Sequence, residues 1–238
     1  MKHMLSPSLF SSAFFFILLS YLCFLFSPTS NVVSQSPVAY YKFVLQWPRA
    51  VCPTFASNCI SPLPNIPTIH GLWPETVTGV TPPIRNPAEK FNKNKFLDLL
   101  PELNIKWPTL LLRFTNQGFW LHEWGKHGKS SDFDQRQFFH KTLDVYSMID
   151  PMNRMAHVGL HPGTYTLQTI NSRLIAEYGG KVQIICITNI LGFQVQELRF
   201  NVTFDSAGQP QVHPFTPPDQ GCQAASTNGA RFWLRFLS

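Results

Sequence analysis

The sequence contains the stretch FWLHEWGKHG at residues 119–128. Its apolar residues predict a helix over residues 119–127. The polar side chains of this helix are His122, Glu123, Lys126 and His127. Since Glu123 and His127 are four residues apart, they share one helical face. Because such groups are costly to bury together, the stretch predicts either a site for an anionic ligand or a solvated charge pair beside a partly buried histidine.

The two histidines of this stretch do not predict a zinc site. A zinc-binding HExxH helix places its histidines four residues apart, on one face. His122 and His127 are five residues apart, which is about 140° round a helix at about 100° per residue. Since they cannot chelate one ion from a regular helix, we expect no metal and no other cofactor.

A second stretch, IHGLWP at residues 69–74, supplies another imidazole, His70. Gly71 allows a substrate or a backbone segment to approach closely. Trp73 offers a flat face on which a nucleic-acid base could stack, and packing in the core is the alternative for this side chain.

The histidines of the two stretches suit cleavage of an RNA phosphodiester. That reaction needs two imidazoles in opposite protonation states. One removes the proton of the 2'-hydroxyl, and the other protonates the leaving 5'-oxygen. A nearby lysine stabilises the charge that develops on phosphorus, and Lys126 is in place for this.

Together, IHGLWP and FWLHEWGKHG resemble the two active-site segments of the T2 family of secreted ribonucleases. The stretch YYKFVLQWPRAVC at residues 40–52 is most similar to the S-RNases of rose-family plants and their S-like relatives. The resemblance extends from about Tyr40 to Cys222. It implies an α+β fold with an antiparallel sheet, and endonucleolytic cleavage of single-stranded RNA through a 2',3'-cyclic phosphate without a metal.

The resemblance also implies a role for each matching residue. His70 and His127 match the acid–base pair of the family, with His127 as the base. His122 matches a histidine that contacts phosphate, and Glu123 with Lys126 matches the pair that stabilises the transition state. The residues implied to contact bases are Trp73, Phe119 and Gln46.

Residues 1–34 have the features of a secretory signal. Lys2 and His3 precede an uncharged apolar run at residues 10–26, and small and polar residues follow it. A membrane anchor is the alternative, and it would need about 20 apolar residues. We expect cleavage after Ser34, which leaves residues 35–238 as a single secreted domain, extracellular or vacuolar.

Four cysteines lie beyond the expected signal. They are Cys52, Cys59, Cys186 and Cys222. An even number in an oxidising compartment predicts two disulfides, for which three pairings exist. The segment from Cys52 to Cys59 is short enough to close on itself, which leaves Cys186 to pair with Cys222.

Other elements follow from hydrophobic periodicity and turn residues. The predicted strands are residues 40–46, 181–188 and 193–204, with an apolar segment at 68–73 and a final strand at 232–236. The other predicted helices are residues 91–100, 132–148 and 166–178. We expect Pro101 to stop the first of these helices, and Asp132 or Ser131 to cap the second. This order of elements favours an α+β fold with an antiparallel sheet.

Composition limits the class of protein and its partners. The chain is 44% hydrophobic and 13% charged, with 21 Phe, which excludes an intrinsically disordered chain. The formal charge of +6 becomes +5 when Lys2 leaves with the signal. This charge favours polyanions such as RNA, pectin or a membrane surface, although ordinary solubility explains it equally. We expect a monomer that binds single-stranded RNA and is not held in a membrane.

Three classes of function stay open at this point. The first is an active ribonuclease, including an S-like paralogue in defence or phosphate recycling. The second is recognition in gametophytic self-incompatibility, where a pollen-side protein would bind the surface at residues 77–87. The third is a catalytically silent storage or binding protein. The sequon at Asn201 predicts a glycan in each case.

The chain departs from the T2 pattern at two disulfides. The family usually has KHGTC where residues 126–130 are KHGKS, and the partner cysteine is absent from residues 75–92. A second cysteine pair near the C-terminus is also missing. Because both cysteines of each pair are absent, no cysteine loses its partner. Without the first bridge, we expect the position of the catalytic helix to depend on packing. We also expect Lys129 to add a cation near the phosphate.

The missing bridges predict reduced stability. One disulfide contributes about 2–4 kcal/mol in most proteins, so the melting temperature of this protein should lie below that of a four-disulfide relative. Calorimetry of the two proteins under identical conditions measures the difference. An equal or higher melting temperature for this chain would contradict the prediction.

Overall fold

The computed structural model describes residues 38–52, 57–85, 87–180, 182–189, 192–214, 222 and 231–234. The expected signal at residues 1–34 lies outside this part of the chain. No helix within the described part is long and apolar enough to cross a membrane.

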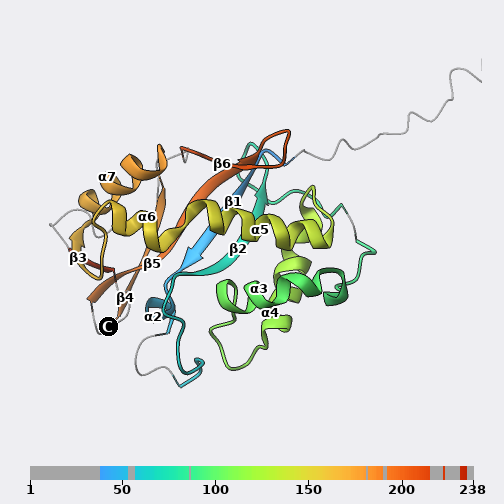
Figure 1. Cartoon of the computed structure of the whole chain (residues 1–238), viewed down its shortest axis with the longest axis horizontal. Coiled ribbons are helices and arrows are strands. Elements are labelled where there is room, and N and C mark those ends of the chain that lie inside the picture. Colours follow the sequence, from blue (N-terminus) through green and yellow to red (C-terminus); the bar gives the residue numbers. More distant parts are fainter. Residues whose placement is uncertain are drawn as a thin grey trace, which may run out of the picture. The chain divides into compact units, whose positions relative to one another are not determined.

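The described strands form one sheet (Figure 1). They are β1 (Tyr40–Gln46), β2 (Thr68–Glu75), β3 (Gly163–Thr166), β4 (Gln183–Asn189), β5 (Gly192–Phe204), β6 (Pro210–His213) and β7 (Arg231–Leu234). The strand β5 is central, because it pairs with β1, β4 and β6 in antiparallel fashion and with β7 in parallel. The predicted α+β fold with a mainly antiparallel sheet is confirmed.

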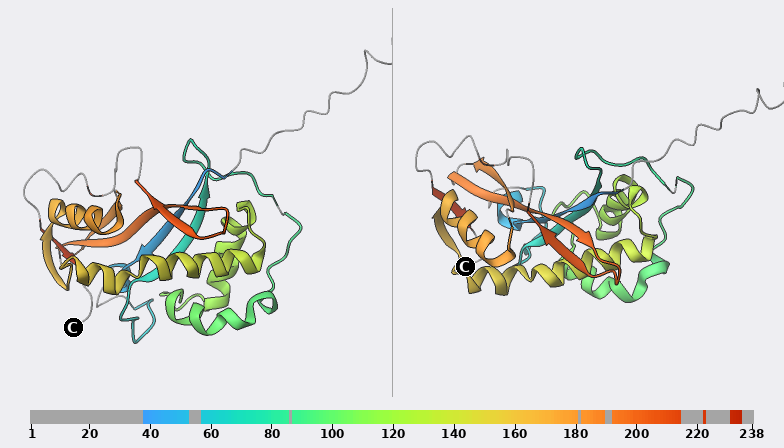
Figure 2. Two further views of the ribbon diagram at one scale, coloured as in Figure 1. Left: turned by 45° about the horizontal axis from the view of Figure 1, so that its top comes forward. Right: turned by 90° about the horizontal axis from the view of Figure 1, so that it is seen from above.

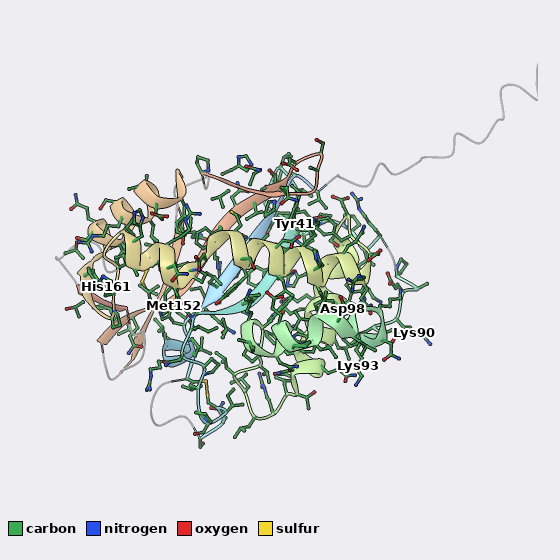
Figure 3. The ribbon with its side chains drawn as sticks, in the orientation of Figure 1. Tyr41, Lys90, Lys93, Asp98, Met152 and His161 are labelled. Atoms are coloured by element: carbon green, nitrogen blue, oxygen red, sulfur yellow. A yellow bond between two sulfur atoms is a disulfide. The ribbon has the colours of Figure 1, made fainter. Side chains whose placement is uncertain are left out.

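One short helix lies between β1 and β2, and the other described helices lie between β2 and β4. They are α2 (Pro48–Val51), the 3-10 helix η1 (Lys93–Leu99), α3 (Leu100–Lys106), α4 (Asn116–Lys126), the 3-10 helix η2 (Gly128–Ser130), α5 (Gln135–Ile149), α6 (Pro151–His157) and α7 (Leu167–Tyr178). The long helix α5 lies across one face of the sheet (Figure 2). An ion pair between Asp98 of η1 and Arg136 of α5 ties these two helices together (Figure 3).

Aromatic side chains fill the space between α4, α5 and the sheet. Phe96 and Phe139 stack with ring centroids 4.3 Å apart. Trp107, Trp124 and Phe138 are fully buried beside them. Burying one such side chain contributes roughly 1.5–3 kcal/mol, so this cluster holds the helical layer against the strands.

The predicted end of the helix at residues 91–100 is wrong. Pro101 does not stop a helix over residues 91–100. A 3-10 helix kinked at Phe96 comes first, and Pro101 lies in the first turn of α3. Proline is favoured there because the first turn does not need its N–H. The sequence also does not predict α2, α6, β3 or β6, which have too few residues to show a period.

The N-cap of α5 is Asp134, not Asp132 or Ser131. The Asp134 carboxylate accepts from the Gln137 N–H, and the Gln137 side chain accepts from the Asp134 N–H. This reciprocal pair is a capping box, which satisfies two backbone donors at once. Asp132 instead pairs with Arg85.

Both disulfide pairings predicted from the cysteine spacing are confirmed. Cys52 bonds to Cys59, and Cys186 of β4 bonds to Cys222. The predicted last strand corresponds to β7, and the residues after Leu234 lie outside the described part.

Polar contacts join the loop after β2 to the segment after α4, where the family resemblance implies a missing disulfide. The Arg85 N–H donates to the Lys129 carbonyl at 2.9 Å, and Lys129 Nζ donates to the Pro87 carbonyl at 3.2 Å. The Arg85 guanidinium also pairs with Asp132. Lys129 therefore points to this loop, and the expectation that it adds a cation near the phosphate is wrong.

Candidate active site

A cleft of about 420 Å³ lies between β2, α4 and β5. All eight residues that the sequence assigned to catalysis or base contact line it. They are Gln46, His70, Trp73, Phe119, His122, Glu123, Lys126 and His127. The sheet and the helical layer thus bring together three segments that are far apart in the chain.

The helix α4 places four of these side chains. Its N-cap is Thr115, whose hydroxyl accepts from the Gly118 N–H at 3.0 Å. Trp120, Glu123 and Trp124 form its buried face, and His122 and Lys126 are exposed to the cleft. The sequence predicts a helix that includes His127. In the structure α4 ends at Lys126 and His127 is its C-cap.

A β-bulge places His70. The β1–β2 register pairs Val44 with Gly71 and Leu45 with Ile69, so His70 is the extra residue on β2. Bulges interrupt the ladder and can aim a side chain toward an active site. The carbonyl of His70 accepts a hydrogen bond from Trp107 Nε1 at 3.0 Å instead.

Tryptophan hydrogen bonds connect this bulge to α4. Trp107 donates its indole N–H to His70, and its own carbonyl accepts from Trp120 Nε1 at 2.8 Å. Since Trp120 belongs to α4, two hydrogen bonds link the strand that carries His70 to the helix that carries Glu123. Sequence reasoning predicted both segments but not this link.

Trp73 contacts both acidic and basic members of the site. Its Nε1 donates to Glu123 Oε2 at 3.1 Å, and its ring stacks on His127 with centroids 5.1 Å apart and an interplanar angle of 21°. A Cβ at Gly71 would overlap Trp73 Nε1 and Glu123 Oε2. Glycine is therefore needed at position 71 for this hydrogen bond to form.

Burial sets the charge state of Glu123 and His127. Glu123 is 2% exposed, and burial raises its pKa from 4.5 to about 7, although His70, Trp73 and Lys126 act in the opposite direction. Burial, together with the charge of Lys126 and other nearby groups, lowers the pKa of His127 from 6.5 to about 3. His127 is therefore a neutral imidazole near pH 7.

Glu197 is a member of the site that the sequence analysis does not predict as functional. Its Oε1 lies 2.8 Å from His70 Nδ1, and its Oε2 accepts from Arg199. The available signal is a pair of opposite charges two positions apart in a largely apolar strand, because such residues lie on one face. That the carboxylate of Glu197 contacts His70 could not be predicted without the sheet register.

Two other predicted residues have backbone contacts. Gln46 is buried, and its Nε2 donates to the Ile69 carbonyl at 3.4 Å. Asn201 is half-buried in β5, and its Nδ2 contacts the Pro214 carbonyl at 3.5 Å. Glycosylation of Asn201 stays a prediction.

The comparisons with known proteins are consistent with one another. Residues 38–212 match the sequence model of the ribonuclease T2 family. Human ribonuclease T2 is 32% identical over 163 residues, and the match covers 65% of this chain and 61% of the human protein, less than two thirds of that relative.

Similarity extends to plant proteins and to solved structures. Ribonuclease S-7 of Nicotiana alata is 30% identical over 204 residues, which cover 81% of this chain and 88% of that protein. The crystal structure of RNase NT in complex with 5'-AMP superposes with a TM-score of 0.68 at 26% identity, covering 77% of this chain and 94% of the other.

The raised pKa of Glu123 predicts a pH-dependent gain in stability for Glu123→Gln. Between pH 4.5 and about 7 the unfolded chain loses this proton and the folded chain keeps it, so the Glu123 contribution to stability falls as pH rises. Relative to wild type, the variant should gain on the order of 3 kcal/mol across this window.

Urea unfolding of both proteins at pH 4.5 and pH 7.5 measures this gain. The difference between them isolates Glu123, because His127 contributes the opposite slope in both proteins from about pH 3 to 6.5. A difference that does not change with pH would contradict the prediction.

The close contact at Gly71 predicts that Gly71→Ala destabilises the protein. The added Cβ would break the Trp73–Glu123 hydrogen bond and leave a buried carboxyl without that donor, which costs about 1–3 kcal/mol. Gly125→Ala on α4 is the matched control, because its Cβ would meet no atom within 4 Å. Alanine there should stabilise the helix by roughly 0.5–1 kcal/mol. Equal urea midpoints for the two variants would refute the role of Gly71.

Proposed function

Since the chain belongs to the ribonuclease T2 family, we propose that it is a secreted endoribonuclease acting on single-stranded RNA. The T2 resemblance found in the sequence is confirmed. The observation that carries the proposed activity is that His70, Lys126 and His127 line one cleft with the other residues that the two motifs supply.

The proposed reaction is a transesterification in which the phosphorus passes from the 5'-oxygen to the 2'-oxygen of the RNA. His127 removes the proton of the 2'-hydroxyl, and the oxygen attacks phosphorus. The P–O2' bond forms as the P–O5' bond breaks, and His70 gives its proton to the leaving 5'-oxygen. The products are a 2',3'-cyclic phosphate and a free 5'-hydroxyl, and the two histidines end with exchanged protonation states.

The surroundings of His127 support its role as the base. Burial and nearby cations keep its pKa low, so it is uncharged before the substrate binds. The negative charge of the RNA phosphate would offset the positive charge of Lys126, which makes the imidazole a stronger base when the substrate is in place.

The exposed side chains of α4 suit contact with the scissile phosphate. His122 and Lys126 lie on the cleft wall and would hold its oxygens and stabilise the charge of the transition state. Glu123, whose pKa is about 7, can donate a hydrogen bond to a phosphate oxygen while it is protonated.

Three side chains are proposed to contact the bases. Phe119 lies beside the imidazole of His70, with ring centroids 6.3 Å apart, and it offers a stacking surface on the cleft wall. Trp73 combines such a role with its contact to His127. Gln46 lines the same cleft and has an amide suited to a base edge.

The same proposal covers the state of the mature protein. Residues 1–34 would be removed on secretion, and residues 35–238 would form a monomer with a glycan at Asn201. No metal or cofactor takes part in the proposed reaction.

A role in recognition is the second candidate, because one loop presents apolar side chains to solvent. Val77, Val80 and Ile84 are 87%, 58% and 48% exposed. A contiguous exposed apolar surface suits binding of a protein partner, such as a pollen-side protein in self-incompatibility. An S-like role without such a partner would need only the cleft.

The proposed mechanism predicts that His70→Ala lowers RNA cleavage at least about 100-fold, which is the scale of a lost general acid. A gel assay with single-stranded RNA, with analysis of the 3' ends for cyclic phosphate, measures this. His161→Ala is the control, because His161 is exposed at the β3–α7 end of the molecule (Figure 3). Cleavage unchanged in His70→Ala, or absent from the wild type, would defeat the proposed activity.

A further inference from the structure

The imidazole of His70 is held at one of its two nitrogens. Nδ1 lies 2.8 Å from Glu197 Oε1. The His70 side chain is 33% exposed, whereas that of Glu197 is 9% exposed. The carboxylate is therefore less exposed than the ring that it holds, and Nε2 is the nitrogen left to meet a substrate in the cleft.

Both oxygens of Glu197 have partners. Oε1 meets His70, and Oε2 accepts from Arg199 Nε at 2.9 Å and Nη2 at 2.7 Å. Burial acts to raise the pKa of Glu197, but the hydrogen bonds and charges of His70 and Arg199 outweigh it and leave the pKa below its usual value. Glu197 is therefore a carboxylate at neutral pH.

Glu197 lies on the most firmly held strand of the sheet. On one side it is opposite Gln46 of β1, and on the other it is opposite Ile185 of β4. Arg199 is two residues along the same face, and its guanidinium lies 5.5 Å from the ring of Trp73. A group on a paired central strand is held more accurately than one on a loop, so the position of Glu197 can fix the plane of the His70 ring.

The second histidine of the site has the opposite environment. Nδ1 of His127 is buried and has no hydrogen-bond partner among the described residues, and the charges nearest to it are cations. Within the described part of the chain, a carboxylate is thus hydrogen-bonded to His70, and none is hydrogen-bonded to Nδ1 of His127. This asymmetry is what a reaction with one acid and one base requires.

We propose that Glu197, oriented by Arg199, is a positioning residue that holds Nδ1 of His70, favours the imidazolium form by its negative charge and aims Nε2 at the leaving 5'-oxygen. This inference rests on the proposed ribonuclease function. Glu197 also lines the cleft, but His70 and Arg199 occupy both of its carboxylate oxygens, so we assign it the holding of His70 rather than contact with the substrate.

Other titratable groups lie near His70 besides Glu197 and Arg199 of β5. They are Glu123, His122 and Lys126 of α4, and His127 at the C-cap of that helix. Glu197 is the carboxylate within hydrogen-bond distance. Its removal should therefore destabilise the imidazolium form of His70 most directly.

The test compares Glu197→Gln with wild type on two substrates. One is the dinucleotide UpA, whose alkoxide leaving group needs a proton. The other is uridine 3'-(4-nitrophenyl phosphate), whose leaving group departs without one. We expect kcat for UpA to fall about 10- to 100-fold. Removing the hydrogen-bond partner of a metal-ligating histidine has an effect of this size. Cleavage of the nitrophenyl ester should fall less than about 3-fold, because general acid catalysis contributes little there.

The pH profile is the second measurement. The alkaline limb of kcat/KM for UpA should move to lower pH by about 1 unit, the usual effect of losing one adjacent opposite charge. Glu177→Gln is the matched control, because Glu177 also bridges an arginine and a histidine, Arg154 and His157, outside the cleft. It should change neither limb nor substrate preference.

The outcomes separate this inference from the proposed function. Equal losses on both substrates, or no loss, with an unmoved pH profile would overturn the role of Glu197. If His70→Ala also retained full activity, the proposed function would fail as well. If Glu197→Gln does not fold by circular dichroism, Arg199→Gln replaces it. Arg199→Gln frees the carboxylate of Glu197 to rotate, so kcat for UpA should again fall more than kcat for the nitrophenyl ester, but by a smaller factor. An equal fall on both substrates would again contradict the inference.

Discussion

A β-bulge on β2 leaves His70 without a partner on β1, and the indole of Trp107 binds the carbonyl of His70 instead. The carbonyl of Trp107 in turn accepts from Trp120 of α4. These two hydrogen bonds join the strand and the helix that carry the two motif histidines. The indole rings are almost fully buried, so an unsatisfied N–H would be costly and the arrangement is strongly favoured. The geometry of the cleft follows from this link.

The same burial gives the site its chemical character. Burial raises the pKa of Glu123 to about 7 and lowers that of His127 to about 3, so both groups resist the charge they would carry in water. Their burial opposes folding at neutral pH, and the surrounding aromatic core must offset it. Active sites commonly lower stability in this way, because the groups that serve the reaction are not those that pack best. A bound phosphate would relieve part of the unfavourable cation cluster around His127.

The structure also shows how the chain is held where the family resemblance implies a disulfide. Backbone and side-chain contacts of Arg85 and Lys129 connect the loop after β2 to the end of α4. Exposed ion pairs contribute little, about 0–1 kcal/mol, so these contacts are a weaker tether than a covalent bond. Packing of Trp124 and Phe138 is the stronger constraint on α4.

Particular residues mark the limit of sequence reasoning. The alternation of residues 193–204 predicts the strand β5, but it does not mark Glu197 as a functional residue. The contact of Glu197 with His70 crosses 127 residues of sequence, and no local pattern encodes such a distance. Pro101 is a similar case, because proline both ends helices and begins them. Which of the two occurs depends on the packing of Phe96 and Leu103 in the core.

The sequence by itself determined the α+β class, the two disulfides and eight of the residues that line the cleft, because these depend on periodicity, cysteine spacing and short motifs. Tertiary structure alone decided that His70 is paired with Glu197, whereas the buried Nδ1 of His127 has no hydrogen-bond partner among the residues that the structure describes. The reason is physical. Charge state depends on burial and on partners supplied by other strands and helices, and those become neighbours only when the sheet register and the helix packing are complete.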